Sequence, residues 1–101
     1  MKNLIIAAAL TLSLTAFAEE AELDVCDEIN NLAQSIMEAR QSGVEMRQLI
    51  QIVRNNEIAD FAIPIIIRAY EKPRFSVEKN KQNAIKDFQN EIYLQCIIET
   101  V

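Results

Sequence analysis

Apolar residues recur every three or four positions in the segment that follows residue 24. This spacing places them on one face of a helix. Asp24 is suitably placed to cap its start, and we expect the helix to end near Gln41. The apolar positions are Cys26, Ile29, Leu32, Ala33, Ile36 and Met37.

A second, shorter helix is predicted after a turn at Gly43, the only glycine in the chain. Ser42 and Glu45 have the spacing of a capping box, in which each side chain accepts a hydrogen bond from the backbone of the other residue. We expect the helix to end at Asn55-Asn56. Its apolar positions are Met46, Leu49, Ile50 and Val53.

Residues 61–67 read Phe-Ala-Ile-Pro-Ile-Ile-Ile and are rich in β-branched side chains, so a strand must be considered. No other segment offers a partner strand, however, and a chain with one glycine has little with which to form hairpins. We therefore predict a buried helix that ends at Glu71-Lys72, before Pro73. Pro64 then either lies in its first turn or kinks a helix that begins near Glu57.

The last segment has the pattern of a long amphipathic helix, and Ser76 is predicted to cap its start. At about 1.5 Å per residue, this helix is roughly 30 Å long and matches the first one. Its apolar face consists of Val77, Ala84, Ile85, Phe88, Ile92 and Cys96, widened by Tyr93 and Ile97.

The first 18 residues have the features of a secretory signal peptide. Lys2 precedes an uncharged stretch from Leu4 to Phe17, and small residues at Ala16 and Ala18 suit signal peptidase. The stretch is short for a membrane helix and its flank is acidic, which disfavours an uncleaved anchor. We predict cleavage after Ala18, a periplasmic or secreted location, no membrane attachment afterwards, and a single domain over residues 19–101.

Two cysteines, Cys26 and Cys96, are available to pair in an oxidising compartment. If they bond, the start of the first helix lies beside the end of the last, and these two helices run antiparallel. Short connections then give an up-down-up-down order. The predicted fold class is all-α: a small up-down four-helix bundle with one disulfide between the first and last helices.

Charge and composition exclude several classes of function. Loss of Lys2 with the leader takes the net charge from −5 to −6, which repels nucleic acid and anionic lipid. The chain has no histidine, and a cysteine pair leaves no thiol, so we expect neither a metal nor a cofactor. Glu57 and Asp60 are the one carboxylate pair weighed for acid–base work, and a solvated helix face is the favoured interpretation. The acids within residues 19–28 are likewise read as a solvated start rather than a functional tail.

Several arginines and aromatic residues are candidates for a binding surface. Arg74 lies between Tyr70 and Phe75 in the sequence, in a short connection between two predicted helices. Arginine with nearby aromatic residues is a composition typical of interface hot spots. Two alternatives remain open: the arginines pair locally with surplus acids, and Phe75 packs under the bundle as core. The candidate interface residues are Tyr70, Arg74, Phe75, Arg40, Arg47 and Arg54.

Two blocks, Arg40-Gln41-x-Gly43-Val44 and Ala69-Tyr70-Glu71-Lys72-Pro73-Arg74-Phe75, together with Cys26 and Cys96, resemble a family of short exported helical proteins of Gram-negative bacteria and their prophages. The resemblance implies export, paired cysteines and a helical domain. It implies no activity, and its prophage association points toward interference between phage and host. A looser likeness to small disulfide-closed chaperones of the acid-stressed periplasm agrees in size but departs in cysteine spacing.

These observations rank three functions. The leading one is a protein-binding module that inhibits or modulates another periplasmic protein. The alternative is an acid- or stress-induced periplasmic chaperone. An enzyme comes last, because no catalytic constellation was found.

Overall fold

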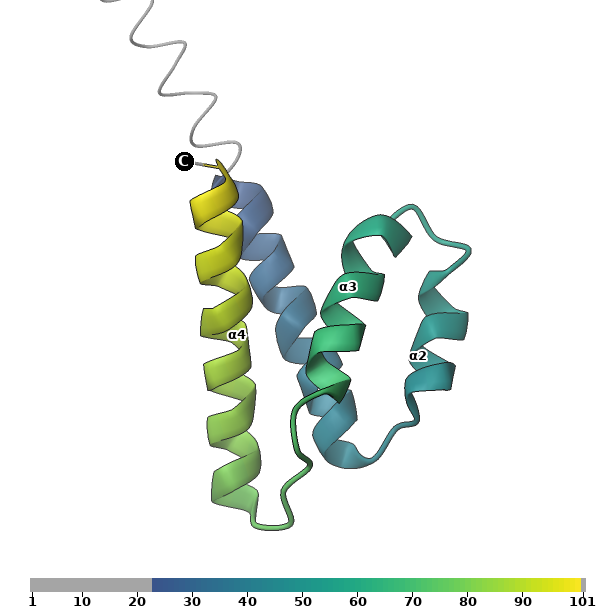
Figure 1. Cartoon of the computed structure of the whole chain (residues 1–101), viewed down its shortest axis with the longest axis vertical. Helices are drawn as coiled ribbons and strands as arrows, with labels where there is room; N and C mark the ends of the chain where they lie inside the picture. Colours follow the sequence, from purple (N-terminus) through teal and green to yellow (C-terminus); the bar gives the residue numbers. More distant parts are fainter. Residues whose placement is uncertain (1–22, 101) are drawn as a thin grey trace, which may run out of the picture.

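The computed structural model describes residues 23–100, so the predicted leader and its cleavage position lie outside the described residues. The first helix covers residues 23–42. It is followed by α2 (Met46–Val53), α3 (Ala59–Tyr70) and α4 (Glu78–Thr100) (Figure 1). No strand occurs in residues 23–100, and the segment weighed as helix or strand is helical. The all-α prediction is confirmed.

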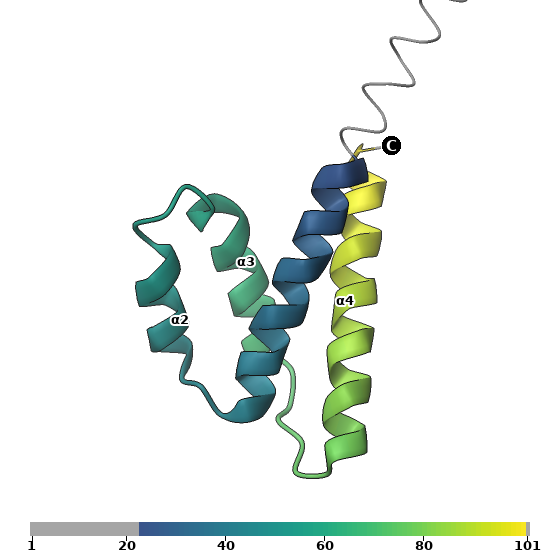
Figure 2. The same ribbon diagram turned by 180° about the vertical axis from the view of Figure 1, so that it is seen from behind.

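The helices alternate in direction, as the predicted bundle requires. The first helix and α4 run antiparallel and side by side, whereas α2 lies on the outer side of α3 (Figures 1 and 2). A disulfide between Cys26 and Cys96, whose Cα atoms are 5.7 Å apart, joins the start of the first helix to the end of α4. The predicted topology and cysteine pairing are confirmed. None of the helices in residues 23–100 combines the length and apolarity needed to cross a membrane.

The first helix ends in a Schellman motif around Gly43. The Gly43 amide donates to the Arg40 carbonyl (3.1 Å) and the Val44 amide to the Ala39 carbonyl (3.0 Å). Gly43 has a φ of +90°, a value that residues with a side chain rarely adopt. The turn predicted at this glycine is therefore confirmed.

The capping box lies one turn later than predicted. Its members are Glu45 and Gln48, at the start of α2, rather than Ser42 and Glu45. The Glu45 amide donates to Oε1 of Gln48 (3.3 Å). Ser42 is still helical, because the Schellman turn that ends the first helix comes after it.

Pro64 lies in the interior of α3, so its placement in the first turn is wrong. The alternative, a helix that begins near Glu57 and contains the proline, is closer to the observed start at Ala59. Proline removes the amide that would bond the Asp60 carbonyl, and both residues are exposed, so water can replace that bond. At its other end α3 stops at Tyr70, within one residue of the prediction.

Ser76 does not cap the last helix. α4 begins at Glu78, and the Lys81 amide donates to the carbonyl of Val77 (3.0 Å). Val77 is 56% exposed and does not join the core. The helix thus begins one residue later than a cap at Ser76 would give.

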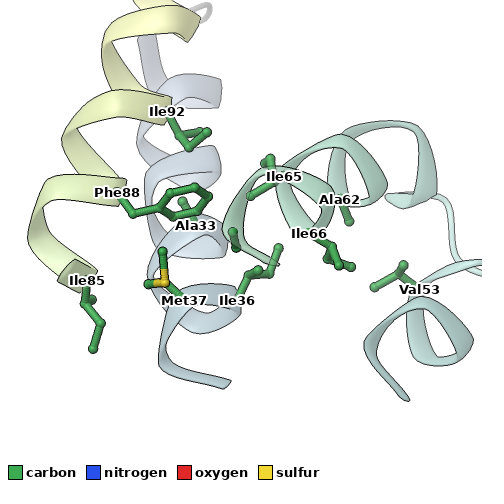
Figure 3. Packing of buried hydrophobic residues seen from close by; sticks show 11 residues of the cluster. Ala33, Ile36, Met37, Val53, Ala62, Ile65, Ile66, Ile85, Phe88 and Ile92 are labelled. Carbon is green, nitrogen blue, oxygen red and sulfur yellow. The ribbon is translucent and has the colours of Figure 1, made fainter. Parts of the chain in front are cut away.

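The core lies where α3 meets the hairpin of the first helix and α4. Figure 3 shows Phe88 of α4 against Ala33 and Met37, with Ile65 of α3 directed toward them. Ala62 and Ile66 point instead toward Val53 of α2. α3 is thus buried on two sides, which explains its continuous apolar sequence. The buried cluster is Ala33, Ile36, Met37, Val53, Ala62, Ile65, Ile66, Ala69, Ile85, Phe88 and Ile92.

Candidate functional site

The connection between α3 and α4 is fastened to the end of the first helix by Arg40. Its Nε and Nη2 donate to the carbonyl of Lys72 at 3.2 and 3.0 Å. The guanidinium also lies 5.1 Å from the centroid of the Tyr70 ring, within the range of a cation–π contact. The Tyr70 hydroxyl in turn donates to the carbonyl of Val44. Two predicted interface residues, Arg40 and Tyr70, therefore contact each other inside the chain.

Gln41 is the buried polar centre of this connection, with 2% of its surface exposed. Its Nε2 donates to the carbonyl of Pro73 (2.9 Å), and its Oε1 accepts from the amide of Phe75 (2.9 Å). Its own carbonyl accepts from Lys81 Nζ (3.0 Å) and Arg74 Nε (3.3 Å). The sequence interpretation gave Gln41 no role. Its position four residues after the core residue Met37 is the signal that could have placed it on the buried face.

Arg74 lies directly over Gly43. A Cβ on Gly43 would be 2.7 Å from Nη2 and 2.9 Å from the central guanidinium carbon of Arg74. Glycine therefore serves two purposes here: it adopts the positive φ and it leaves room for the guanidinium.

The two sequence blocks on which the family resemblance was based are thus one contact region, which we call the corner joint (residues 40–44 and 70–75). The side chains of Arg40, Tyr70 and Arg74 all donate hydrogen bonds to backbone carbonyls of the corner joint. These internal contacts explain the three residues without an external partner. Phe75 is half-buried, beside Met37 and Phe88 at a surface hollow of about 300 Å³. The remaining two candidate interface residues, Arg47 and Arg54, lie outside the corner joint.

Those two candidates, Arg47 and Arg54, are exposed at either end of α2. Glu57 and Asp60, the carboxylates weighed for acid–base work, are exposed as well. No group of three or more metal-ligating side chains occurs in the described part of the chain.

Both tyrosines have raised pKa values. Burial raises the pKa of the Tyr70 hydroxyl, and the positive charge of Arg40 partly offsets the increase. The carboxylate of Asp27 raises the pKa of Tyr93, with smaller contributions from burial and from a hydrogen bond to Asp27. Both hydroxyls are therefore neutral donors at physiological pH.

A groove of about 450 Å³ opens at the opposite end of the molecule, beside the disulfide. We call it the disulfide-end groove. One wall is the first helix, the second is α3 and the third is the last two turns of α4. Its lining is Val25, Ile29, Asp60, Phe61, Pro64, Ile65, Arg68, Ile92, Gln95, Cys96, Glu99 and Thr100.

Phe61 of α3 stands between the disulfide-end groove and a second hollow, and it lines both. It is 57% exposed, and it shares the second hollow, of about 250 Å³, with Ile58, Glu28 and Leu32. Val25 and Ile58 beside it are 47% and 43% exposed. Large apolar side chains thus remain in contact with water around the groove.

The sequence interpretation missed this surface because it treated residues 61–67 as wholly buried. Two helical stripes overlap in α3. Ala62, Ile66 and Ala69 are buried, whereas the groove is lined by Phe61, Pro64, Ile65 and Arg68, which follow the i, i+3, i+4, i+7 spacing. This second stripe is the signal that the sequence offered.

No match to a known protein was found. This holds for protein-family models, for curated proteins and for solved structures. The resemblance to exported prophage-associated proteins therefore stays a prediction.

Proposed function

We propose that this chain is an exported protein-binding module that acts in the periplasm as an inhibitor or modulator through direct contact with a partner protein. The observation that carries the proposal is the disulfide-end groove, in which an exposed Phe61 stands among apolar side chains of three helices. Contiguous exposed apolar surface with a polar rim is typical of interaction sites.

The scaffold suits this role because it is held at both ends. The disulfide fixes the first helix and α4 beside the groove, and the corner joint fixes them at the other end. A rigid surface loses little conformational entropy on binding, so a small domain can bind tightly with a modest contact area.

Two features support export. The leader sequence has the organisation of a cleavable signal peptide. The Cys26–Cys96 disulfide belongs to a class of bond that persists in oxidising compartments and is rare in the cytosol.

The proposal is tested by capture followed by reconstitution. The tagged full chain would be expressed in a Gram-negative host and cross-linked in the periplasm, and bound proteins would be identified by mass spectrometry. We expect one partner to bind the purified mature chain in calorimetry and to change its own activity when bound. Retention of the chain in the cytoplasm as a dithiol, or the lack of any partner beyond those of an unrelated exported helical protein, would overturn the proposal.

A chaperone would behave differently in the same preparations. It would bind many unfolded clients without a fixed stoichiometry, and it would suppress aggregation and bind a hydrophobic dye once acidified. With no histidine in the chain, such an acid switch must act through carboxylates, which in model peptides titrate near pH 4. Saturable binding of one partner at neutral pH is the result expected of a binding module.

A further inference from the structure

We infer that the disulfide-end groove binds a basic amphipathic helix of the partner protein. This inference rests on the proposed function and names the surface and the chemistry of the partner. It is drawn from the shape of the groove and from the distribution of charge around it.

The shape of the groove fits a helix. Its walls are the sides of helices, and α3 presents Phe61, Pro64, Ile65 and Arg68 along one stripe. A volume of about 450 Å³ accommodates a few large apolar side chains of a ligand. Amphipathic helices bind such grooves with anchors at i, i+3 or i+4, and i+7, the spacing that α3 itself offers.

The charge around the groove is strongly negative. The start of the first helix, the start of α3 and the end of α4 lie toward one end of the molecule (Figure 1). Acidic residues predominate over Arg54 and Arg68 there, and Arg68 already lies 4.0 Å from Glu91. Asp60 and Glu99 line the groove, and Glu28 lines the adjoining hollow. Near the same helix ends in the sequence lie Asp24, Asp27 and Glu57.

The basic residues gather at the other end. Lys72, Arg74, Lys79 and Lys81 lie in or next to the corner joint and the first turn of α4, and Arg40 is bound within that joint. Four acids lie at this end as well and largely balance its positive charge: Glu38, Glu45, Glu71 and Glu78. The groove end, where acids outnumber basic residues, is therefore the more negative end of the bundle. A ligand that combines apolar anchors with flanking lysine or arginine complements both properties.

The same charge argues against other occupants. An anionic membrane surface would be repelled by the acids around the groove. A second copy docked groove to groove would bring two acidic rims together. A basic helix alone gains from the apolar lining and from the acidic rim at once.

The test uses a synthetic peptide about four helical turns long. Leucines at i, i+3, i+4 and i+7 form one face, and lysines fill the remaining positions. One control peptide has glutamate in place of lysine, and another has the leucines and lysines in scrambled order. We expect the amphipathic lysine peptide to bind the mature disulfide-bonded chain about tenfold or more tightly than either control, and to bind more weakly at high salt.

Matched variants locate the site. Phe61→Ala removes an exposed ridge and should weaken peptide binding about tenfold, whereas Leu94→Ala removes a side chain of α4 that is 60% exposed and lines neither hollow, and should have no effect. The double variant Glu28→Gln with Glu99→Gln should bind the lysine peptide more weakly, and its affinity should depend less on salt concentration. Glu38→Gln with Glu71→Gln, distant from the groove, should leave both unchanged. Far-UV circular dichroism would show that all four proteins remain folded.

Equal binding of the lysine and glutamate peptides, or equal binding by the Phe61→Ala and wild-type chains, would overturn the inference. So would a Phe61-dependent dimer, or Phe61-dependent binding to anionic vesicles. If a periplasmic partner is captured equally well by Phe61→Ala, the binding function stands and the groove assignment is wrong. If no partner is captured while the peptide binds as described, the groove assignment stands and the proposed function fails.

Discussion

The amide of Phe75 donates a 2.9 Å hydrogen bond to Oε1 of Gln41, thirty-four positions earlier in the chain. The same side chain donates to the carbonyl of Pro73, so one amide group satisfies two backbone groups of the connection that enters α4. The first helix and α4 are thereby joined at one end by the disulfide and at the other by Gln41. The disulfide-end groove lies beside the first of these two attachments.

Replacement of Gln41 tests the corner joint. Gln41→Leu keeps the volume but leaves the Phe75 amide and the Pro73 carbonyl without their partner. Pro73 is exposed and Phe75 half-buried, so water can partly replace the lost bonds. We therefore expect a loss of about 1–2 kcal/mol in the free energy of unfolding. Urea denaturation followed by circular dichroism would measure it. Gln34→Leu, on the exposed side of the same helix, should change stability by no more than about 0.5 kcal/mol, and equal effects would contradict the role of Gln41.

Replacement of Gly43 tests the close approach of Arg74. Gly43→Ala should destabilise the chain by about 1–2 kcal/mol, because alanine is strained at a φ of +90°. The added methyl group should also displace the guanidinium of Arg74. This displacement breaks the hydrogen bond from Arg74 Nε to the Gln41 carbonyl. In an Arg74→Ala background only the backbone strain remains, so the cost of Gly43→Ala should be smaller. A double-mutant cycle with a coupling energy of zero would rule out the contact.

The sequence left open whether Phe75 is a core residue or an interface residue, and its partial burial lies between the two. A fully buried phenylalanine costs about 3–5 kcal/mol on truncation, and a pure interface residue costs almost nothing. Because Phe75 is half-buried against Met37 and Phe88, we expect Phe75→Ala to cost about 2 kcal/mol. Val77→Ala, at a position that is 56% exposed, serves as the control. Calorimetric melting would measure both, and no loss for Phe75→Ala would return this residue to the binding surface.

Stability should fall at alkaline pH through the tyrosines. Burial raises the pKa of Tyr70 above the ordinary value of 10.0, so the fold favours the protonated hydroxyl. This contribution is complete below pH 10 and is lost as the pH rises through the raised value. Tyr70→Phe should reduce the alkaline loss and cost about 1 kcal/mol at neutral pH through its hydrogen bond to Val44.

Ultraviolet absorbance of tyrosinate checks the assignment, since the chain has two tyrosines and no tryptophan. Asp27→Asn should lower the pKa of Tyr93 toward its ordinary value and leave that of Tyr70 unchanged. An alkaline transition that is identical in wild type and Tyr70→Phe would contradict the role of Tyr70.

The disulfide and the leader can be examined in one preparation. The exported chain should begin at Glu19 and be two hydrogen masses lighter than its dithiol form. Because the bond closes a loop of 70 positions, Cys26→Ser with Cys96→Ser should lower stability by about 4 kcal/mol. Intact mass spectrometry and urea denaturation provide the measurements, and a full-length exported species with two thiols would refute both expectations.

The sequence alone determined the helices, the turn at Gly43 and the cysteine pairing with its antiparallel topology. These depend on periodicity, on one residue type at one turn, and on the presence of only two cysteines, all of which are local or compositional. The tertiary structure decided the rest. α4 begins at Glu78, one residue later than a cap at Ser76 would give. The Phe75 backbone just before it is held by Gln41, which is distant in sequence. The disulfide-end groove likewise exists only because three helices converge around Phe61, and no local pattern records which of two overlapping stripes another helix will cover.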